Sequence, residues 1–445
     1  MKQIPPILCA AMILNTANGN SGKPLIKDFL GLNGHFQFRP ELYRPTCRLV
    51  RNYHNIDWDV NAPGDPITIP KCVNKVDWDK NVYGKWAKHG FETDICLQFS
   101  RFSESNKEYR QLWEEKEEWA RQYGRAVADY FGSRKLATSI EIGNEPGNDF
   151  DDKLYQKLFI NMASGIRAAD PDLKIVTATA HAREADKYSK SLDETFASPK
   201  IKGLYDVINL HVYPIKPKSK AYSPWDRSYP EDPQLDYLKI VDETIAWRNK
   251  HAPDKEIWIT EFGYDSCTPE AMEKRTGWFK KLNWRGVTDE QQAQYLIRSL
   301  LCFSKRDIDR AYIYFFNDSD QASVHAASGL TRNFKPKPSF WAVKHFYETL
   351  GDYRFSRVIL EETDGVHIFE FTKNKNPTDT IWVAWTTQGE KRHCKIDAQR
   401  LPGTLIKAER MPFSNAPSPV VVGPEGESFI IIDLSEPPTY LHFTQ

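Results

Sequence analysis

Two carboxylates stand where apolar runs of the sequence end. Residues 140–142 lead through a glycine and an asparagine into Glu145, and residues 256–260 lead into Glu261. Short runs rich in β-branched residues and bounded by glycine or proline are typical of strands. Either acid alone could merely pair with a neighbouring arginine or lysine. Two acids converging on one site would allow a protonated carboxyl to donate a proton while an ionised carboxylate attacks.

The elements that must position these acids repeat along most of the chain. Between about residues 27 and 350, apolar runs alternate with amphipathic helical patterns. The eight runs are 27–36, 47–54, 93–99, 137–145, 173–181, 205–213, 256–263 and 310–317. This series predicts a (β/α)8 barrel, an α/β fold whose reactive groups gather at the carboxyl ends of the strands. The first connection, residues 37–46, is too short for more than a single helical turn.

Two helices have recognisable ends. Thr288 and Gln291 have the spacing of a capping box, which predicts that a helix begins there. A second helical pattern opens with Pro338 and stops at Gly351, where helices tend to begin and end. These signals place the last two barrel helices around the eighth strand.

The hydrophobic pattern of the sequence changes after residue 352. Short runs of period-two alternation, separated by Asp-Gly, Asn-Pro and Pro-Gly turns, occupy 353–445 and predict a β-sandwich of about 90 residues. We therefore expect a catalytic barrel over 23–352 and an accessory sandwich over 353–445. The sandwich could cover the flank of the barrel or bind sugar.

The amino terminus, residues 1–22, is similar to a signal peptide. Lys2 precedes an apolar run from Ile4 to Leu14 and then small residues. The expected location is therefore secreted or periplasmic. No run approaches 18 apolar residues, so no membrane span is expected.

Composition excludes several classes of protein. Lysine plus arginine equals aspartate plus glutamate, at 60 each, so no basic field suggests a nucleic-acid partner. Seven cysteines without a CxxC pair disfavour a zinc ribbon or a disulfide network. A barrel metal hydrolase would need a His-x-His on its first strand, where only His35 stands, and no phosphate loop or G-x-S-x-G elbow occurs. No metal and no cofactor are expected. Aromatic residues reach 13%, which suits stacking on sugars or packing of a large barrel.

The two acids end the fourth and seventh runs, so both should face the same barrel mouth. Glycoside hydrolysis needs such a pair. A carboxyl separation of about 5–5.5 Å means retention of configuration, and a wider gap means inversion. The neighbouring charge of Glu261 and a partly dry site are expected to raise the pKa of Glu145 to roughly 6.

At these residues the chain resembles the clan A glycoside hydrolases. The motifs are Asn144-Glu145-Pro146 and Thr260-Glu261-Phe262-Gly263. The resemblance implies that Glu145 is the acid/base, that Glu261 is the nucleophile of a retaining reaction, and that Asn144 binds the sugar 2-hydroxyl.

Three further positions match the clan. His211 and Tyr213 match its His-x-Tyr on the sixth strand, and Arg51 matches its second-strand arginine. By the resemblance Tyr213 holds the nucleophile, His211 lies near the acid/base or the sugar, and Arg51 keeps the nucleophile ionised. Residues 50–58, 143–147 and 288–299, with the appended sandwich, look most like family 39, which includes β-xylosidases and an iduronidase.

Other substrate contacts are expected where loops leave the strands. The eighth run ends in Tyr-Phe-Phe-Asn-Asp, where many family 5 members place a tryptophan, so Phe316 or a loop tryptophan is expected to substitute. The candidates are His54, Asn55, Gln98, Tyr222, Trp225, Trp278, Trp284, Phe316 and Asn317, and a structural role at the barrel rim explains His54 equally well. Anionic substrates would be met by Lys216, Lys218, Lys220 and Arg227, although a solvated surface explains these cations equally well.

The expected function is a retaining glycosidase that acts on a β-linked oligosaccharide or polysaccharide. The resemblance to family 39 implies a β-xylosidase-like activity, and long loops, which favour a walled pocket, predict exo action. The alternatives are a non-catalytic carbohydrate-binding barrel and an endo-acting glycanase of family 5 type.

Overall fold

The computed structural model describes residues 22–69, 76–99, 111–146, 152–180, 185–217, 225–362, 365–373, 379–387, 392–420, 422–425 and 429–444. The signal peptide expected over 1–22 lies outside these ranges except for its last residue. Within the described part of the chain, no helix has the length and apolarity that crossing a membrane requires.

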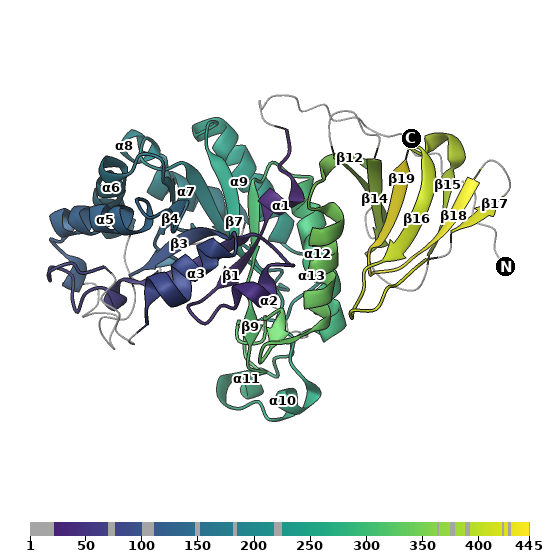
Figure 1. Ribbon diagram of the computed structural model, residues 1–445, viewed down its shortest axis with the longest axis horizontal. Helices are drawn as coiled ribbons and strands as arrows, with labels where there is room; N and C mark the ends of the chain where they lie inside the picture. The colour runs from purple at the N-terminus through teal and green to yellow at the C-terminus, as the bar shows by residue number, and fades with distance from the viewer. Residues whose placement is uncertain are drawn as a thin grey trace.

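Eight parallel strands close into a barrel in the order β1 to β8 (Figure 1). They are β1 Leu30–Gly34, β2 Leu49–Asn55, β3 Glu92–Gln98, β4 Ser139–Ile142, β5 Lys174–Val176, β6 Val207–His211, β7 Glu256–Phe262 and β8 Arg310–Ile313. The predicted (β/α)8 barrel is confirmed. The run 27–36 was expected to be a strand throughout, but it opens with a helical turn, α1 (Ile26–Phe29). That turn packs its two apolar side chains, Ile26 and Phe29, into the barrel core. Several other strands are shorter than the runs that predicted them.

Helices surround the barrel and cover the apolar faces of its strands (Figure 1). The longer ones are α5 Glu117–Phe131, α6 Asp152–Ala169, α7 Ala185–Phe196, α9 Tyr237–His251, α12 Asp289–Ser304 and α13 Pro338–Leu350. The shorter ones are α2 Pro40–Tyr43, α3 Tyr83–Lys88, α8 Pro199–Lys202, α10 Pro269–Glu273, α11 Gly277–Lys281, a π-helical turn Trp78–Val82 and a 3-10 turn Ile56–Trp58, while a second 3-10 turn, Ala398–Arg400, lies in the sheets that follow the barrel. The first connection is the single turn α2, as predicted, and the capping box of α12 is present at Thr288 and Gln291.

Two antiparallel sheets follow the barrel (Figure 1). One has the order β12-β13-β14-β19-β16, with β12 Arg354–Glu361, β13 Val366–Thr372, β14 Asp379–Thr386, β16 Thr404–Arg410 and β19 Thr439–Thr444. The other has the order β15-β18-β17, with β15 Arg392–Asp397, β17 Gly423–Glu425 and β18 Phe429–Leu434. Trp382 and Leu441 of the first sheet and Ile432 of the second belong to one buried cluster, as in a β-sandwich. Strand β15 was not expected, because only Cys394 and Ile396 among its residues are apolar.

A buried arginine joins the barrel to these sheets. Arg298 of α12 is fully buried and makes a bidentate contact with Glu231, at 2.9 and 2.5 Å. Arg298 also donates to the carbonyl oxygen of Thr387, and the Trp385 indole donates to Glu231 at 2.7 Å. Removing one member would leave a buried charge unpaired, which is costly, so this network holds the sheets against α12.

A small sheet lies at the carboxyl end of the barrel. It comprises β9 Asn317–Asp318, β10 Thr331–Arg332 and β11 Lys335–Pro336, in the order β11-β10-β9. Buried Lys337 donates to Asp318 at 3.1 Å and to the carbonyl oxygens of Ser266 and Ala327. These contacts shape the loop after β8, which contributes to the pocket described next.

Candidate active site

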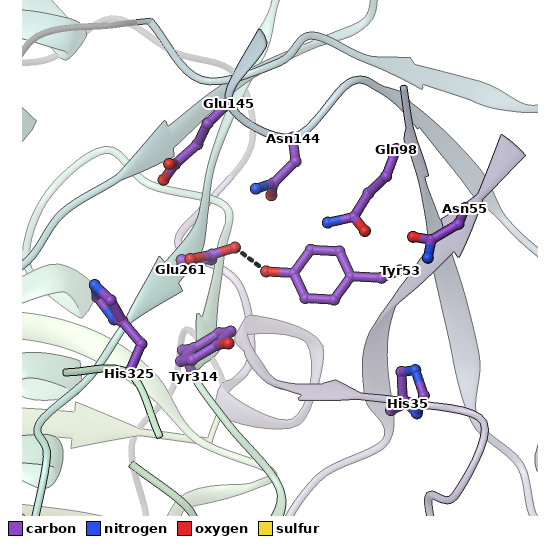
Figure 2. A pocket seen from close by; sticks show the side chains of 9 residues that line it. All are labelled: His35, Tyr53, Asn55, Gln98, Asn144, Glu145, Glu261, Tyr314 and His325. Carbon is purple, nitrogen blue, oxygen red and sulfur yellow. Dashed lines mark hydrogen bonds between the residues drawn. The ribbon is translucent and has the colours of Figure 1, made fainter. Parts of the chain in front are cut away.

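A cavity of about 370 Å³ opens at the carboxyl ends of the barrel strands. Its lining comprises His35, Tyr53, Asn55, Gln98, Asn144, Glu145, Glu261, Tyr314 and His325. Figure 2 shows the two carboxylates and His325 toward one end of the pocket, with Asn55 and His35 toward the other. The lining is dominated by hydrogen-bonding groups, and no tryptophan belongs to it.

Both carboxylate oxygens of Glu261 accept hydrogen bonds. Oε1 accepts from Nη1 of Arg51 at 2.9 Å and from the hydroxyl of Tyr53 (Figure 2). Oε2 accepts from the hydroxyl of Tyr213 at 2.8 Å. Three donors directed at one carboxylate stabilise its ionised form.

The pKa of Glu261 follows from this environment. Glu261 is only 5% exposed, and burial by itself would raise its pKa. The charges of His211 and Arg51 and the two tyrosine hydroxyls outweigh burial and lower the pKa to about 2. The group is therefore an anion over the whole range in which the protein would work.

Arg51 is itself held by a second buried acid. Its Nε and Nη2 donate to Oε2 and Oε1 of Glu141 at 2.7 and 2.6 Å, and both side chains are fully buried. Nη1 also donates to Asn33, and Nη2 donates to Oδ1 of Asn144 at 2.8 Å. A bidentate pair fixes a guanidinium in orientation as well as in charge. Glu141 thus aligns the arginine that faces Glu261.

Glu145 lies across the pocket from this network and is more open, with 39% of its side chain exposed. Its Oε1 lies 2.9 Å from Nδ1 of His211, whose Nε2 lies 3.0 Å from the Thr260 hydroxyl. One oxygen each of Glu145 and Glu261 and one nitrogen of His211 lie within 4.8 Å of one another. The sequence placed these two acids in one mouth, and the structure brings them together.

The structure does not show the expected rise in the pKa of Glu145. Burial raises this pKa and the charge of Glu261 adds to the rise, as expected. The hydrogen bond and charge of His211 act more strongly in the other direction, and the pKa is lowered from its ordinary value. The sequence could place His211 only near the acid/base or the sugar, so the sign could not be worked out from it.

Glu145, His211 and Glu261 could also supply ligands to a metal ion. The donor set does not suit one well. The positive guanidinium of Arg51 is 2.9 Å from Glu261, and Tyr53 and Tyr213 also direct hydroxyl hydrogens at that carboxylate. A cation would have to compete with all three, whereas an anionic nucleophile is stabilised by them.

Six of the residues singled out from the sequence surround this site together with Gln98, which lines the pocket. The six are Arg51, Asn144, Glu145, His211, Tyr213 and Glu261. Their functional roles remain predictions, but their convergence depends on four different strands, β2, β4, β6 and β7, ending at one mouth, and Gln98 adds β3.

Other candidates lie elsewhere. His54 is fully buried, with its ring nitrogens against the Tyr83 hydroxyl and Asp59, so it packs behind the pocket rather than lining it. Phe316 is 5% exposed among other aromatic rings. The Asn317 side-chain oxygen accepts from the Phe334 amide, which fixes the loop after β8. Because His54 and Phe316 are buried in packing contacts, their expected contact with substrate is corrected. Asn317 is half-buried and is not among the described lining residues of the pocket, and its contact with substrate stays a prediction.

The aromatic and basic candidates on the loops also differ in burial, and none of those that the structure describes lines the pocket. Trp284 is fully buried, half-buried Trp225 does not line the pocket, and Trp278 is 63% exposed. Arg227, expected as an exposed cation, is 5% exposed and pairs with Asp265 at 3.0 Å. Tyr222, Lys218 and Lys220 lie outside the described residues.

Asn55, which the sequence placed at the end of the second strand, lines the pocket as expected. Four lining residues were not singled out for substrate: Tyr53, Tyr314, His325 and, in this role, His35. For Tyr53 a signal existed, since it lies on the run that carries Arg51. Side chains alternate between the two faces of a strand, so Tyr53, two residues after Arg51 in β2, lies on the same face as Arg51. Tyr314 and His325 depend on the path of the loop after β8, for which the sequence holds no comparable signal.

Replacing Tyr53 with phenylalanine is expected to raise the pKa of Glu261. The hydroxyl stabilises the ionised carboxylate, and a hydrogen bond to a charged group contributes about 1.5–3 kcal/mol, or roughly 1–2 pKa units. The acidic limb of the pH profile of kcat/KM should therefore move upward by that amount. Tyr314→Phe is the matched control, since Tyr314 lines the same pocket and makes no hydrogen bond to Glu261 among the described contacts. An unmoved acidic limb in Tyr53→Phe would contradict the role of this hydroxyl.

Comparison with known proteins supports the fold. Neither a protein-family model nor a curated protein sequence matches the chain. Among solved structures, a family 39 glycoside hydrolase from Bacteroides cellulosilyticus WH2 is similar with a TM-score of 0.67 and 19% identity, covering 95% of this chain and 81% of the other. A family 30 endoxylanase from Clostridium papyrosolvens C71 has a TM-score of 0.58 and 13% identity, covering 96% and 98%. A family 51 α-L-arabinofuranosidase from Bifidobacterium longum has a TM-score of 0.58 and 12% identity, covering 94% and 96%. The chain therefore shares the fold of these glycoside hydrolases, and the resemblance drawn from the sequence motifs is confirmed at the level of architecture.

Proposed function

We propose that this protein is a retaining O-glycoside hydrolase acting on equatorially linked sugars. The observation that carries the proposal is the pair Glu145 and Glu261, from the ends of β4 and β7, with oxygens within 4.8 Å of each other. Retaining enzymes hold their carboxyl groups about 5–5.5 Å apart, whereas inverting enzymes need roughly 6.5–9.5 Å to admit a water. The short separation supports a covalent glycosyl intermediate.

The two environments assign the two roles. Glu261 is buried, ionised and held by three donors, so it is the group suited to attack the anomeric carbon. Glu145 is more open, with 39% of its side chain exposed, and its Oε1 lies beside Nδ1 of His211, so it is the group suited to exchange a proton with the leaving oxygen and with water. In the first step the bond from Glu261 to the anomeric carbon forms while the glycosidic bond breaks and Glu145 gives its proton to the departing oxygen. In the second step Glu145 takes a proton from water, whose oxygen displaces Glu261.

Asn144 has its orientation set by the arginine. Its Oδ1 accepts from Nη2 of Arg51, so its amide nitrogen is the atom that can donate to a substrate hydroxyl. Hydrogen bonds to the sugar 2-hydroxyl strengthen as positive charge develops at the anomeric carbon. This geometry supports the role that the clan resemblance implied for Asn144.

The neighbouring structures suggest the kind of substrate. They include proteins described as a family 30 endoxylanase and a family 51 α-L-arabinofuranosidase. We propose an exo-acting, β-xylosidase-like activity for this chain, with export from the cell as the corresponding location. An endo-acting glycanase is the alternative.

The test is release of reducing sugar and nitrophenol from β-xylosides, β-glucosides, β-galactosides, α-L-arabinosides and plant or algal polysaccharides. Release by the wild type, and not by Glu261→Gln, would establish hydrolysis and name the sugar, and the product lengths would separate chain-end from internal cleavage. If neither protein releases sugar from any substrate and both retain a polysaccharide, the barrel is a binding protein and the proposal is wrong.

A further inference from the structure

The segment between β7 and α12, residues 267–287, forms a lobe that projects from the carboxyl end of the barrel. Figure 1 shows its two short helices, α10 and α11, beyond β9 at the bottom of the view. At its base, the Thr268 amide and hydroxyl donate to Asp320 at 2.9 and 2.6 Å, and the Ser266 amide donates to the carbonyl oxygen of Ala327 at 2.8 Å. Asp320 and Ala327 bracket His325, which lines the catalytic pocket. The lobe therefore stands on the rim of that pocket.

The lobe has an internal structure. Trp284 is fully buried, its ring packs at 5.6 Å from that of Phe279, and its amide donates to the Phe279 carbonyl oxygen. Gly277 and Asn283 adopt positive φ angles of 57° and 50°, which bend the chain on either side of α11. The orientation of α11 is thus determined by packing around Trp284.

Helix α11 presents a tryptophan to solvent. Trp278 is 63% exposed. Among the described residues the other exposed large apolar side chains are Val358 and Ile406, which both lie in the sheets that follow the barrel. A solvent-facing indole on a packed lobe offers a flat apolar surface at a defined place. Flat amphipathic rings of this kind suit stacking against the apolar face of a sugar ring.

Positive charge surrounds this ring. Residues 267–287 contain five basic and two acidic side chains in a chain of zero net charge. The exposed cations are Lys274, Lys280, Lys281 and Arg285. No ion pair joins any of these four to an acid in the part of the chain that the structure describes. At the base, by contrast, Lys337 and Arg332 are neutralised by Asp318 and Asp289.

We propose that this lobe, residues 267–287, binds an anionic polysaccharide, with Trp278 stacked on a sugar ring and the lysines facing carboxylate or sulfate groups. The inference rests on the proposed function, since it makes the lobe an extension of a carbohydrate-cleaving pocket. Clustered cations attract a polyanion and lose that attraction as salt screens them. An exposed tryptophan with lysines could also meet an anionic membrane. The position of the lobe on the pocket rim favours a polymer that reaches the carboxylates.

The test measures binding in the full-length Glu261→Gln chain, so that no substrate is consumed. The probes are polygalacturonate for carboxylate, dextran sulfate for sulfate, xylan as a polysaccharide with few charges, and phosphatidylserine vesicles. Trp278→Ala tests stacking, and the triple change Lys274→Glu, Lys280→Glu and Lys281→Glu tests charge. Its matched control reverses three exposed lysines on helices α6, α8 and α9, namely Lys153, Lys200 and Lys250. Circular dichroism and thermal melting confirm that each variant is folded.

We expect binding to at least one polyanion, weakened about tenfold or more by Trp278→Ala and by the triple change, weakened by added salt, and little altered in the control. Preference for dextran sulfate or polygalacturonate would tell sulfate from carboxylate. Absence of polyanion binding, equal loss in the control, or binding to vesicles alone would overturn the proposal. Hydrolysis by the wild type is scored separately, so docking without hydrolysis would refute the proposed function and leave the lobe assignment standing.

Discussion

Glu261→Gln is expected to lower kcat by at least about 10⁴-fold while the protein remains folded. Removing a nucleophile from an enzyme that uses covalent catalysis costs on this scale. Glutamine keeps the shape of the side chain but carries no negative charge, so it cannot form the glycosyl ester. The measurement is steady-state hydrolysis of the best aryl glycoside, with thermal melting alongside.

The control for Glu261→Gln is a buried glutamate of the same kind outside the site. Glu370 in β13 is 5% exposed and accepts a bidentate contact from Arg357 at 2.9 and 3.0 Å. Glu370→Gln should lower the melting temperature and leave kcat unchanged. Should Glu261→Gln retain a tenth or more of wild-type kcat, Glu261 would not be the nucleophile.

Glu145→Ala is expected to separate substrates by their leaving groups. Glycosides with poor leaving groups should lose about 10²–10⁴-fold in kcat/KM, the usual contribution of a positioned acid. Glycosides of acidic phenols should lose far less in kcat/KM, because their departing oxygen needs no proton. Their kcat should still fall, since no base remains to activate water against the glycosyl intermediate, and KM should fall with it as that intermediate accumulates.

Azide distinguishes an acid/base from a merely structural acid. Azide needs no deprotonation, and truncation of Glu145 leaves room beside the sugar. It should restore turnover of Glu145→Ala and yield a glycosyl azide with the configuration of the substrate. In Glu261→Ala, azide would attack from the nucleophile side and give the opposite configuration. If azide leaves Glu145→Ala unchanged, the acid/base role falls to another group.

The lowered pKa of Glu145 has a consequence for pH dependence. In the free protein burial raises this pKa, but His211 lowers it further than burial raises it. The acid/base must be protonated for the first step, so kcat/KM, which reports the free enzyme, should already decline above the acidic range. His211→Ala would remove the lowering contact and move this basic limb to higher pH. A profile of kcat/KM whose basic limb stays in place in that variant would show that His211 does not control Glu145.

The pair of carboxylates at the barrel mouth was predictable because its signals are local in sequence. Glu145 and Glu261 each follow a β-branched run, and strand count alone places both at one end of a barrel. Arg51 and Tyr213 were found through a resemblance whose motifs are equally short. Glu141 was present within residues 140–142 as an acid in the middle of a buried strand, and burying a charge demands a partner. That partner, Arg51, is 90 residues away, so only the closed barrel shows the contact.

The aromatic loop residues illustrate the opposite case. Trp278 and Trp284 are six residues apart in one loop and had identical sequence arguments. One is 63% exposed and the other is fully buried, because the turns at Gly277 and Asn283 direct one ring outward and fold the other under Phe279. Phe316 and His54 lie near the ends of predicted strands, as Glu145 and Glu261 do, but both side chains are buried in packing contacts.

Hydrophobic period and chain order are enough to assign strands and their ends, so the barrel, the sheets that follow it and the two acids at its mouth could be predicted from the sequence. Three features required the folded structure: the hydroxyls that bind Glu261, the histidine that lowers the pKa of Glu145, and the tryptophan that is exposed to solvent. Those outcomes depend on distances between segments far apart in the chain and on the competition between burial and charge at each group, and neither quantity is written in local sequence.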